Sequence, residues 1–179
     1  LYIFVGVIAL GLLITAVTVF LGKRDPYSMV YKGVKFTFRR KVKDAYSVEV
    51  HNKTNILRLL ADPPAVFIGN KRIPWEVHIA FPNTTSKKGI YAIEGFELTM
   101  KLKTYYLINN RNVEIDGVPI DSEEELKRLG ESVIYLVGPD ITNETKVYAN
   151  GNIVYVMGKS DKDFDLATIR LILLILNRS

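Results

Sequence analysis

The hydrophobic and polar positions divide the chain into one long apolar run and a region of shorter, periodic segments. Residues 1–21 carry no charged side chain. A helix of that length spans about 31 Å, which is close to the hydrocarbon thickness of a bilayer. Charged residues and Pro26 then end the run. We therefore expect a transmembrane helix at residues 1–22 and a juxtamembrane linker at residues 23–28.

Other interpretations of the apolar run fit less well. A cleaved signal peptide has a basic start, an apolar segment of about 7–15 residues and a small-residue cleavage site. A core helix is seldom apolar on every side over such a length. Because the chain begins at Leu1 and not at Met, we also expect that a short leader was removed.

The segment after the linker alternates with period two and predicts a β-hairpin that bends at Gly33. Its apolar side chains are Met29, Tyr31, Val34, Phe36 and Phe38.

A basic run follows this hairpin and consists of Arg39, Arg40, Lys41 and Lys43. Such a run can bind phosphates, lipid headgroups or an acidic partner. It can also be a solvated edge strand whose charges block edge-to-edge pairing. No aromatic side chains are interleaved with these charges, so the pattern favours the edge strand.

Short segments in the middle of the chain predict further strands and helices. A helix at residues 54–61 would be capped by Asn52 or Thr54. Ser122 and Glu125 form a capping box for a short helix that ends before Gly130. The expected strands are residues 47–51, 65–68 and 75–81, the last two joined across residues 69–72, and residues 113–121 are expected to turn at Asp116-Gly117.

Residues 89–109 fit a helix and a strand about equally well. A strand would place Phe96, Leu98, Met100 and Leu102 on one face. A helix would place an apolar stripe on one side, made of Ile90, Ile93, Phe96, Met100 and Leu107. The length of the segment favours the helix.

The last fifty residues predict a buried strand, a hairpin and a closing helix. Residues 133–137 are continuously apolar, as expected of a central strand. Asn150-Gly151 predicts a tight hairpin between its flanking strands. A helix at residues 166–176, capped by Asp163 or Asp165, is too short to cross a membrane at ~16 Å and is expected in the core. Together these segments predict an α+β fold, in which an N-terminal transmembrane helix precedes one mixed-sheet domain at residues 29–179 with a C-terminal core helix.

Composition narrows the chemistry that this domain can perform. The chain has 24 Lys and Arg against 19 Asp and Glu, a net charge of +5, and all of these charges lie beyond Leu21. There is no Cys, which excludes disulfides, thiolate nucleophiles and thiolate metal sites. The sequence contains no phosphate-binding Gly loop, dinucleotide fingerprint or Gly-x-Ser-x-Gly motif.

Two signals disagree about the side of the membrane on which the domain lies. Lys23 and Arg24 favour the cytoplasm by the positive-inside rule. Four Asn-X-Ser/Thr sequons favour an exported, glycosylated domain. They begin at Asn52, Asn83, Asn143 and Asn177. Because basic residues before Leu1 would alter the charge rule, we expect the domain outside the cytoplasm.

The two histidines each end a Glu-Val-His triplet, at Glu49–His51 and Glu76–His78. Side chains two residues apart share one face of a strand. Two such strands as neighbours would offer two imidazoles and two carboxylates to zinc or another divalent metal. The competing interpretation is coincidence on solvent-facing strands, and it is the one we favour. Residues 161–165 similarly look like the start of a calcium loop, but Leu166 and Ile172 stand where Gly and Glu are required, so a helix cap is expected.

Several motifs resemble uncharacterised archaeal single-pass membrane proteins. They are Val133–Pro139, Asn143–Val147, Gly151–Val154 and Gly158–Ser160 before the apolar helix, together with Ile79–Phe81 and Phe96–Leu98. The resemblance covers the greater part of the region after the apolar run. It implies an archaeal envelope protein and no catalytic residue.

These observations predict a non-enzymatic, membrane-anchored envelope protein without a cofactor, whose extracytoplasmic domain binds other surface or membrane components. The expected partners are the membrane and other envelope proteins or copies of the chain. Nucleic acid is disfavoured because no nucleic-acid-binding module is recognised. One alternative is a subunit of a pilus-like filament whose apolar helix packs in the filament core. Another is a metal-dependent enzyme that uses the Glu-Val-His triplets.

Overall fold

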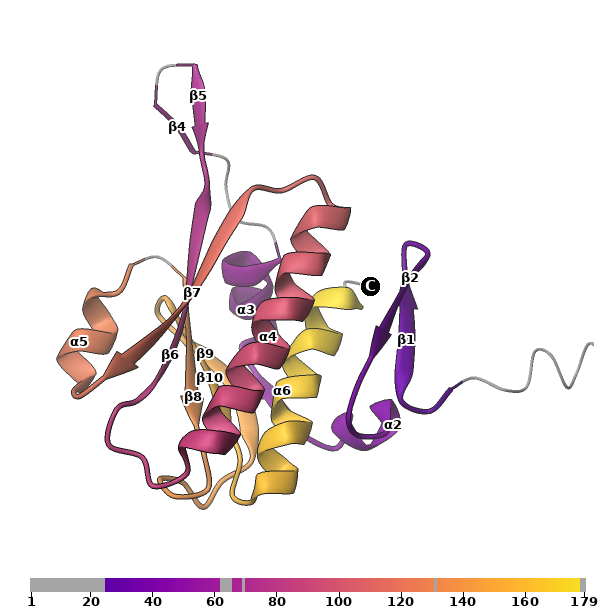
Figure 1. Ribbon diagram of the computed structural model, residues 1–179, viewed down its shortest axis with the longest axis vertical. Coiled ribbons are helices and arrows are strands. Elements are labelled where there is room, and N and C mark those ends of the chain that lie inside the picture. The colour runs from indigo at the N-terminus through magenta and orange to yellow at the C-terminus, as the bar shows by residue number, and fades with distance from the viewer. Residues whose placement is uncertain (1–24, 62–65, 69, 131, 178–179) are drawn as a thin grey trace, which may run out of the picture.

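Six strands form a mixed sheet in the order β3-β9-β10-β8-β6-β7 (Figure 1). All neighbours are parallel except β9 and β10, which form an antiparallel hairpin. The strands are β3 (Glu49–His51), β6 (Trp75–Pro82), β7 (Val113–Ile120), β8 (Val133–Val137), β9 (Lys146–Asn150) and β10 (Ile153–Met157). The predicted α+β fold with a mixed sheet and a C-terminal helix is confirmed.

This computed structural model describes residues 25–61, 66–68, 70–130 and 132–177. The predicted transmembrane helix at residues 1–22 lies outside the described residues, as does the start of the linker. Within the described part of the chain, no helix combines the length and the apolar character needed to cross a membrane.

The helices lie in two layers on either side of the sheet (Figure 1). One face is covered by α4 (Lys88–Ile108) and α6 (Asp161–Leu176), which also pack against each other. Among the described residues, the opposite face carries only the short helix α5 (Glu123–Arg128), whose Leu126 belongs to a small apolar cluster with Ala80 and Val133. The sheet therefore has one closed face and one largely open face.

Side chains along each strand alternate between the two faces of the sheet. In β8, Ile134 and Leu136 join the large core under α4 and α6, whereas Val133 and Tyr135 face the other way. The prediction that residues 133–137 form a central strand is confirmed, because β8 lies between β10 and β6.

Helix α6 forms the middle of the core, as predicted, but it begins earlier than expected. It starts at Asp161, and its N-cap is Ser160, whose Oγ accepts a hydrogen bond from the Asp163 amide at 3.1 Å. The predicted caps Asp163 and Asp165 are therefore wrong. Gly158 precedes the helix at a point where a Cβ atom would lie 2.2 Å from the Phe164 backbone, so the chain can pass there only as glycine.

The N-terminal part of the domain packs beside α4 and α6. The predicted hairpin is confirmed as β1 (Ser28–Tyr31) and β2 (Val34–Thr37), with Lys32 and Gly33 at positive φ in the turn. The predicted edge strand at residues 39–43 is wrong, because the chain leaves the hairpin and forms α2 (Val42–Ala45) against α6. Helix α3 (Lys53–Leu60) then follows β3.

Two turns differ from the sequence-based expectation. β4 (Val66–Ile68) pairs with β5 (Lys71–Ile73), not with β6, and this small hairpin projects beyond the sheet (Figure 1). The predicted turn at Asp116-Gly117 is wrong, since β7 continues through both residues in register with His78 and Ile79 of β6. Helix α5 agrees with its capping signal, because Ser122 Oγ accepts from the Glu125 amide at 3.2 Å.

Helix α4 confirms the predicted helix but reverses its predicted face. Its buried side chains are Tyr91, Glu94, Leu98, Leu102, Tyr105 and Tyr106. Of the predicted apolar stripe, Ile90 packs against the core, but the other four side chains point outward, with Phe96 65% and Leu107 77% exposed. The prediction failed because bulky tyrosines, which carry a polar hydroxyl, fill the core side: Tyr105 and Tyr106 donate to the carbonyls of Ala61 and Leu60.

The burial of α6 leads to a stability prediction. Leu171 is 0% exposed, so Leu171→Ala should lower the free energy of unfolding by about 2–5 kcal/mol, because both apolar contacts and packing volume are lost. The matched control is Leu107→Ala on the exposed side of α4, which should change stability by less than about 0.5 kcal/mol. Urea denaturation of the purified proteins measures both. Equal effects would show that α6 is not the core of the domain.

Candidate functional site

The open face of the sheet presents a row of three tyrosines. Each is the middle residue of a five-residue strand: Tyr135 of β8, Tyr148 of β9 and Tyr155 of β10. In the sheet register Tyr155 lies between the other two. His51 of β3 extends the same row beyond Tyr148, and Ala80 of β6 extends it beyond Tyr135.

The rings of this tyrosine row contact one another in two ways. Tyr148 and Tyr155 are stacked, with centroids 4.5 Å apart and planes 6° from parallel. Tyr135 meets Tyr155 at 5.8 Å and 75°, in an edge-to-face contact. Tyr155 therefore contacts both of the other rings.

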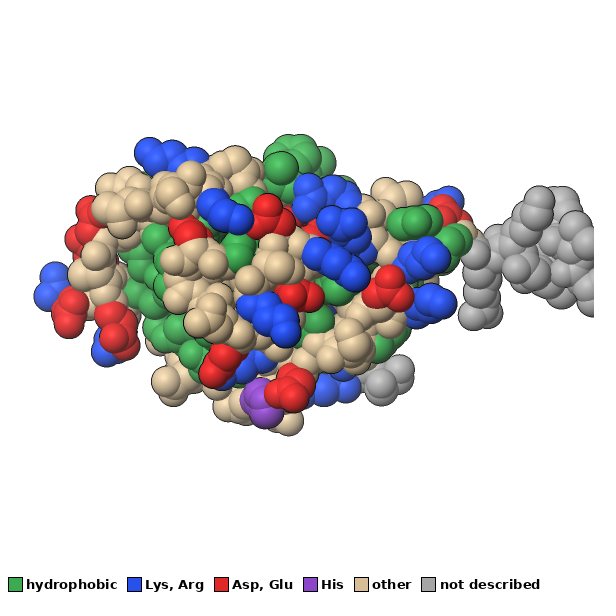
Figure 2. Space-filling model, turned by 90° about the horizontal axis from the view of Figure 1, so that it is seen from below, with side chains coloured by type: hydrophobic (Ala, Val, Ile, Leu, Met, Phe, Trp, Pro, Cys, Tyr) green, Lys and Arg blue, Asp and Glu red, His purple; other side chains and the backbone are tan. Residues whose placement is uncertain are grey.

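A hollow of about 520 Å³ lies between the tyrosine row and α5. Its floor includes apolar side chains of the small core on this face, and its rim is polar. The lining residues are Pro82, Thr84, Ile120, Asp121, Ser122, Glu123, Leu126, Tyr135, Tyr148, Asn150 and Tyr155. In Figure 2, hydrophobic side chains lie next to the charged side chains at the left edge, where α5 is located in Figure 1.

The charge in this hollow is negative. Asp121 and Glu123 are the ionisable acidic groups of the lining, which contains no Lys or Arg. Partial burial is the main cause that raises the pKa of each of the three tyrosines. Asp140 raises the pKa of Tyr135 further, whereas the Lys146 ammonium lowers that of Tyr148. The Glu123 carboxylate adds a smaller increase to all three pKa values. Asp121 accepts a hydrogen bond from Asn83, and Glu123 forms an exposed ion pair with Lys127 at 3.0 Å. The Glu123 charge thus acts on every ring of the row.

A second position that could hold a ligand is already filled. In a parallel sheet, ligands bind where neighbouring strands send their connections to opposite sides, here between the ends of β6 and β8. Tyr91 occupies that place: its hydroxyl donates to Asp140 at 2.8 Å and accepts from the Gly138 amide at 2.7 Å. A Cβ atom on Gly138 would lie 2.7 Å from this hydroxyl. Burial, followed by the hydrogen bond to Asp140, raises the pKa of Tyr91.

The Glu-Val-His triplets lie on strands that are not neighbours. β3 and β6 are separated by β9, β10 and β8, so the adjacent strands that a shared metal site would require do not occur. His51 lies 3.4 Å from Glu49, while His78 Nδ1 lies 2.6 Å from Asp116 and its Nε2 3.9 Å from Glu76. Among the described residues no group of three or more His, Asp or Glu side chains is arranged to hold a metal ion.

The sequon asparagines differ in how far their side chains are engaged. Asn143 is exposed in the loop before β9. The amide groups of the other three donate hydrogen bonds: Asn52 to the Ala149 carbonyl, Asn83 to Asp121 and Asn177 to Tyr46. Asn52, Asn83 and Asn143 are all exposed, and of these Asn143 is the candidate glycan acceptor whose side-chain amide is not engaged by these hydrogen bonds.

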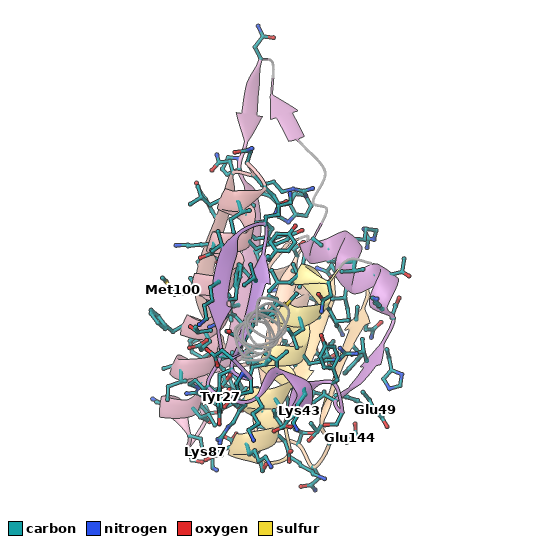
Figure 3. All side chains as sticks on the ribbon, turned by 90° about the vertical axis from the view of Figure 1, so that its right-hand side faces the viewer. Tyr27, Lys43, Glu49, Lys87, Met100 and Glu144 are labelled. Carbon is teal, nitrogen blue, oxygen red and sulfur yellow. The ribbon has the colours of Figure 1, made fainter. Side chains whose placement is uncertain are left out.

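The basic run is exposed, but its two arginines form ion pairs with buried carboxylates. Arg39 reaches Glu94 of α4 at 2.7 Å and Asp165 of α6 at 3.3 Å, and Arg40 reaches Asp165 at 2.9 Å. These two arginines therefore fasten the N-terminal segment to the helical layer. Lys41 and Lys43 remain exposed, and Lys43 lies on the side of the molecule shown in Figure 3.

The outward stripe of α4 is a second uncovered surface. It consists of Ile93, Phe96, Met100 and Leu107. Met100 lies at the outer edge of the molecule in Figure 3. Phe96 of the stripe borders a hollow of about 230 Å³ with few polar groups, whereas the tyrosine row borders the larger hollow, which also contains charged and polar groups. The hollow is the better candidate for specific binding.

Comparison with known proteins finds no family model, no curated protein and no solved structure that matches this chain. The resemblance to archaeal single-pass membrane proteins stays a prediction.

The sequence analysis missed the tyrosine row, although a signal was present. Three strands of the C-terminal half read Val-Ile-Tyr-Leu-Val, Lys-Val-Tyr-Ala-Asn and Ile-Val-Tyr-Val-Met. Each has tyrosine at its third position, and strand alternation places all three on the face opposite the core. What the sequence does not reveal is that β8, β9 and β10 are adjacent and in register.

The buried carboxylate of Glu94 leads to a pH prediction. Its side chain is 0% exposed, and burial, followed by the nearby Asp165, raises its pKa to about 7. Between pH 4.5 and that value the folded state keeps a proton that the unfolded state loses. Raising the pH through this window should therefore destabilise the wild-type protein relative to Glu94→Gln, by up to about 3 kcal/mol.

Denaturation curves at pH 5 and at pH 8 measure this difference for each protein. Glu124→Gln, which changes an exposed carboxylate of α5, is the matched control and should parallel the wild type. If the difference between wild type and Glu94→Gln were the same at both pH values, the raised pKa would be contradicted.

Proposed function

We propose that this protein is a membrane-anchored envelope protein whose extracytoplasmic domain binds other surface components, without catalysis, through the open face of its sheet. The tyrosine row beside the hollow is the observation that supports binding. Residues 1–21 support the anchor, since their length and composition suit a bilayer. The exposed sequon at Asn143 and the resemblance to archaeal single-pass membrane proteins agree with a place in the envelope.

The tyrosine row suits recognition because the ring contacts hold it in a fixed arrangement. Tyrosine offers a large apolar surface and a polar hydroxyl on few rotatable bonds, so it loses little entropy on binding. Stacking between Tyr148 and Tyr155 already restricts both rings in the free protein, so the entropy lost on binding is smaller still. Neither closed-face packing nor sheet pairing requires three aromatic side chains on the open face.

The two alternatives have less support. A pilus-like filament would use the apolar N-terminal run as its core, and the outward stripe of α4 would favour contacts between copies. A metal-dependent enzyme would need the Glu-Val-His triplets together, and three strands separate them.

The binding proposal predicts crosslinks from one face of the domain only. A photoreactive p-benzoylphenylalanine at Asn150, which is exposed in the hollow, should capture a defined partner in intact cells. Tyr155→Ala should remove that product, because it breaks the ring stack. The same probe at Leu107 on α4 is the control and should give a different pattern. An Asn150 product that persists in Tyr155→Ala would contradict the proposal.

The proposed membrane anchor and the proposed extracytoplasmic side of the domain each lead to a prediction. The full chain should stay in membranes after an alkaline carbonate wash, whereas a chain without residues 1–22 should be soluble. In a host that glycosylates, mass spectrometry should find a glycan on Asn143, and Asn143→Gln should lose it. Recovery of the full chain in the wash would refute the anchor. If Asn52, Asn83 and Asn143 all lacked glycans, the result would indicate that the domain lies in the cytoplasm.

A further inference from the structure

The hollow beside the tyrosine row differs in charge from the rest of the molecule. The whole chain carries +5, yet the lining of the hollow holds two carboxylates, three phenols and no basic side chain. A negatively charged recess attracts cations.

The aromatic groups have the geometry that cations prefer. An ammonium or guanidinium group within about 6 Å of a tyrosine face is attracted by the ring quadrupole. The structure already contains one such contact at the end of the row, where Lys146 Nζ lies 5.2 Å from the Tyr148 centroid. At the other end Tyr135 meets Tyr155 at 75° and lines the hollow.

The carboxylates are placed to complete such a site. Asp121 and Glu123 lie at the start of α5 and line the hollow together with the three tyrosines. Lys127 pairs with Glu123, but both side chains are more than half exposed, and exposed pairs of this kind are worth only about 0–1 kcal/mol. An incoming cation can therefore take the place of Lys127.

The backbone amides at the N-terminus of α5 do not favour an anion in the hollow. Ser122 Oγ already accepts from the Glu125 amide, and the Glu125 carboxylate accepts from the Asp121 amide at 2.8 Å. The remaining polar rim groups, Thr84 and Asn150, are neutral.

We infer that the hollow binds a positively charged side chain, arginine or lysine, presented by an extended segment of a partner protein. This inference rests on the proposed function and names the chemistry of its partner. Tyr135 would stack on the cation, and Asp121 and Glu123 would neutralise it. A planar guanidinium suits this arrangement best, because it can stack on a ring and bond to a carboxylate at once.

The test uses the full chain in a neutral detergent and two fluorescein-labelled peptides. One is acetyl-Gly-Arg-Gly-Arg-Gly-amide, and the other has citrulline, which is neutral and nearly isosteric, in place of both arginines. Fluorescence anisotropy should show binding of the arginine peptide that weakens with added salt, and binding of the citrulline peptide at least about tenfold weaker.

Matched variants locate the site. Asp121→Asn with Glu123→Gln should weaken binding of the arginine peptide by about tenfold. Glu49→Gln with Glu114→Gln removes the same charge from exposed positions on the same sheet face and should leave binding unchanged. Tyr135→Phe, which keeps the ring, should bind like the wild type, and Tyr135→Leu should not.

The outcomes separate this inference from the proposed function. Equal binding of both peptides, no binding of either, or equal losses in the two double variants would overturn the cation site. The Asn150 crosslink would still support a binding face in those cases. Loss of Tyr155-dependent crosslinking together with absent peptide binding would overturn both.

Discussion

The burial of α6 on every side is the constraint on which the rest of the domain depends. A helix whose surface is apolar all round must be covered all round, and one sheet face covers only part of it. Here β9 and β10 lie beneath α6, α4 lies beside it, and α2 and α3 pack on the remainder. The N-terminal segment is thus part of the core packing, and Arg39 and Arg40 bind the only two charged side chains that the described core buries, Glu94 and Asp165.

In this arrangement the two faces of the sheet have different structural roles. The closed face supplies the apolar contacts that hold the domain together, and it receives the residues of every strand that alternate inward. The open face is free of that requirement apart from the small core under α5. Its central strands can therefore place tyrosines in register and still remain stable, which is why we assign binding to this face and not to the α4 stripe.

Local sequence patterns predicted the individual turns, strands and helices better than they predicted which elements pair or pack together. Gly33, Asn150-Gly151 and Ser122 mark their turns or cap through backbone chemistry that needs no distant contact, and all three were confirmed. Asp116-Gly117 carries the same signal within a parallel strand, where pairing with β6 overrides it. The prediction of the buried face of α4 failed because the face that is buried depends on how the sheet and α6 pack against the helix. The candidate site needs strand order as well, and three separate tyrosines do not reveal it.

The pairing of Arg40 with Asp165 has a consequence for how the chain matures. The two residues are 125 positions apart, and α6 is the last described element of the chain. Until α6 has been synthesised, α2 lacks the helix against which it packs, and α4 has only part of its packing surface, on β6 and β7. The domain is thus expected to remain open for almost the whole time of its synthesis. An open chain is the form that a translocation channel accepts, so late closure is compatible with export before folding.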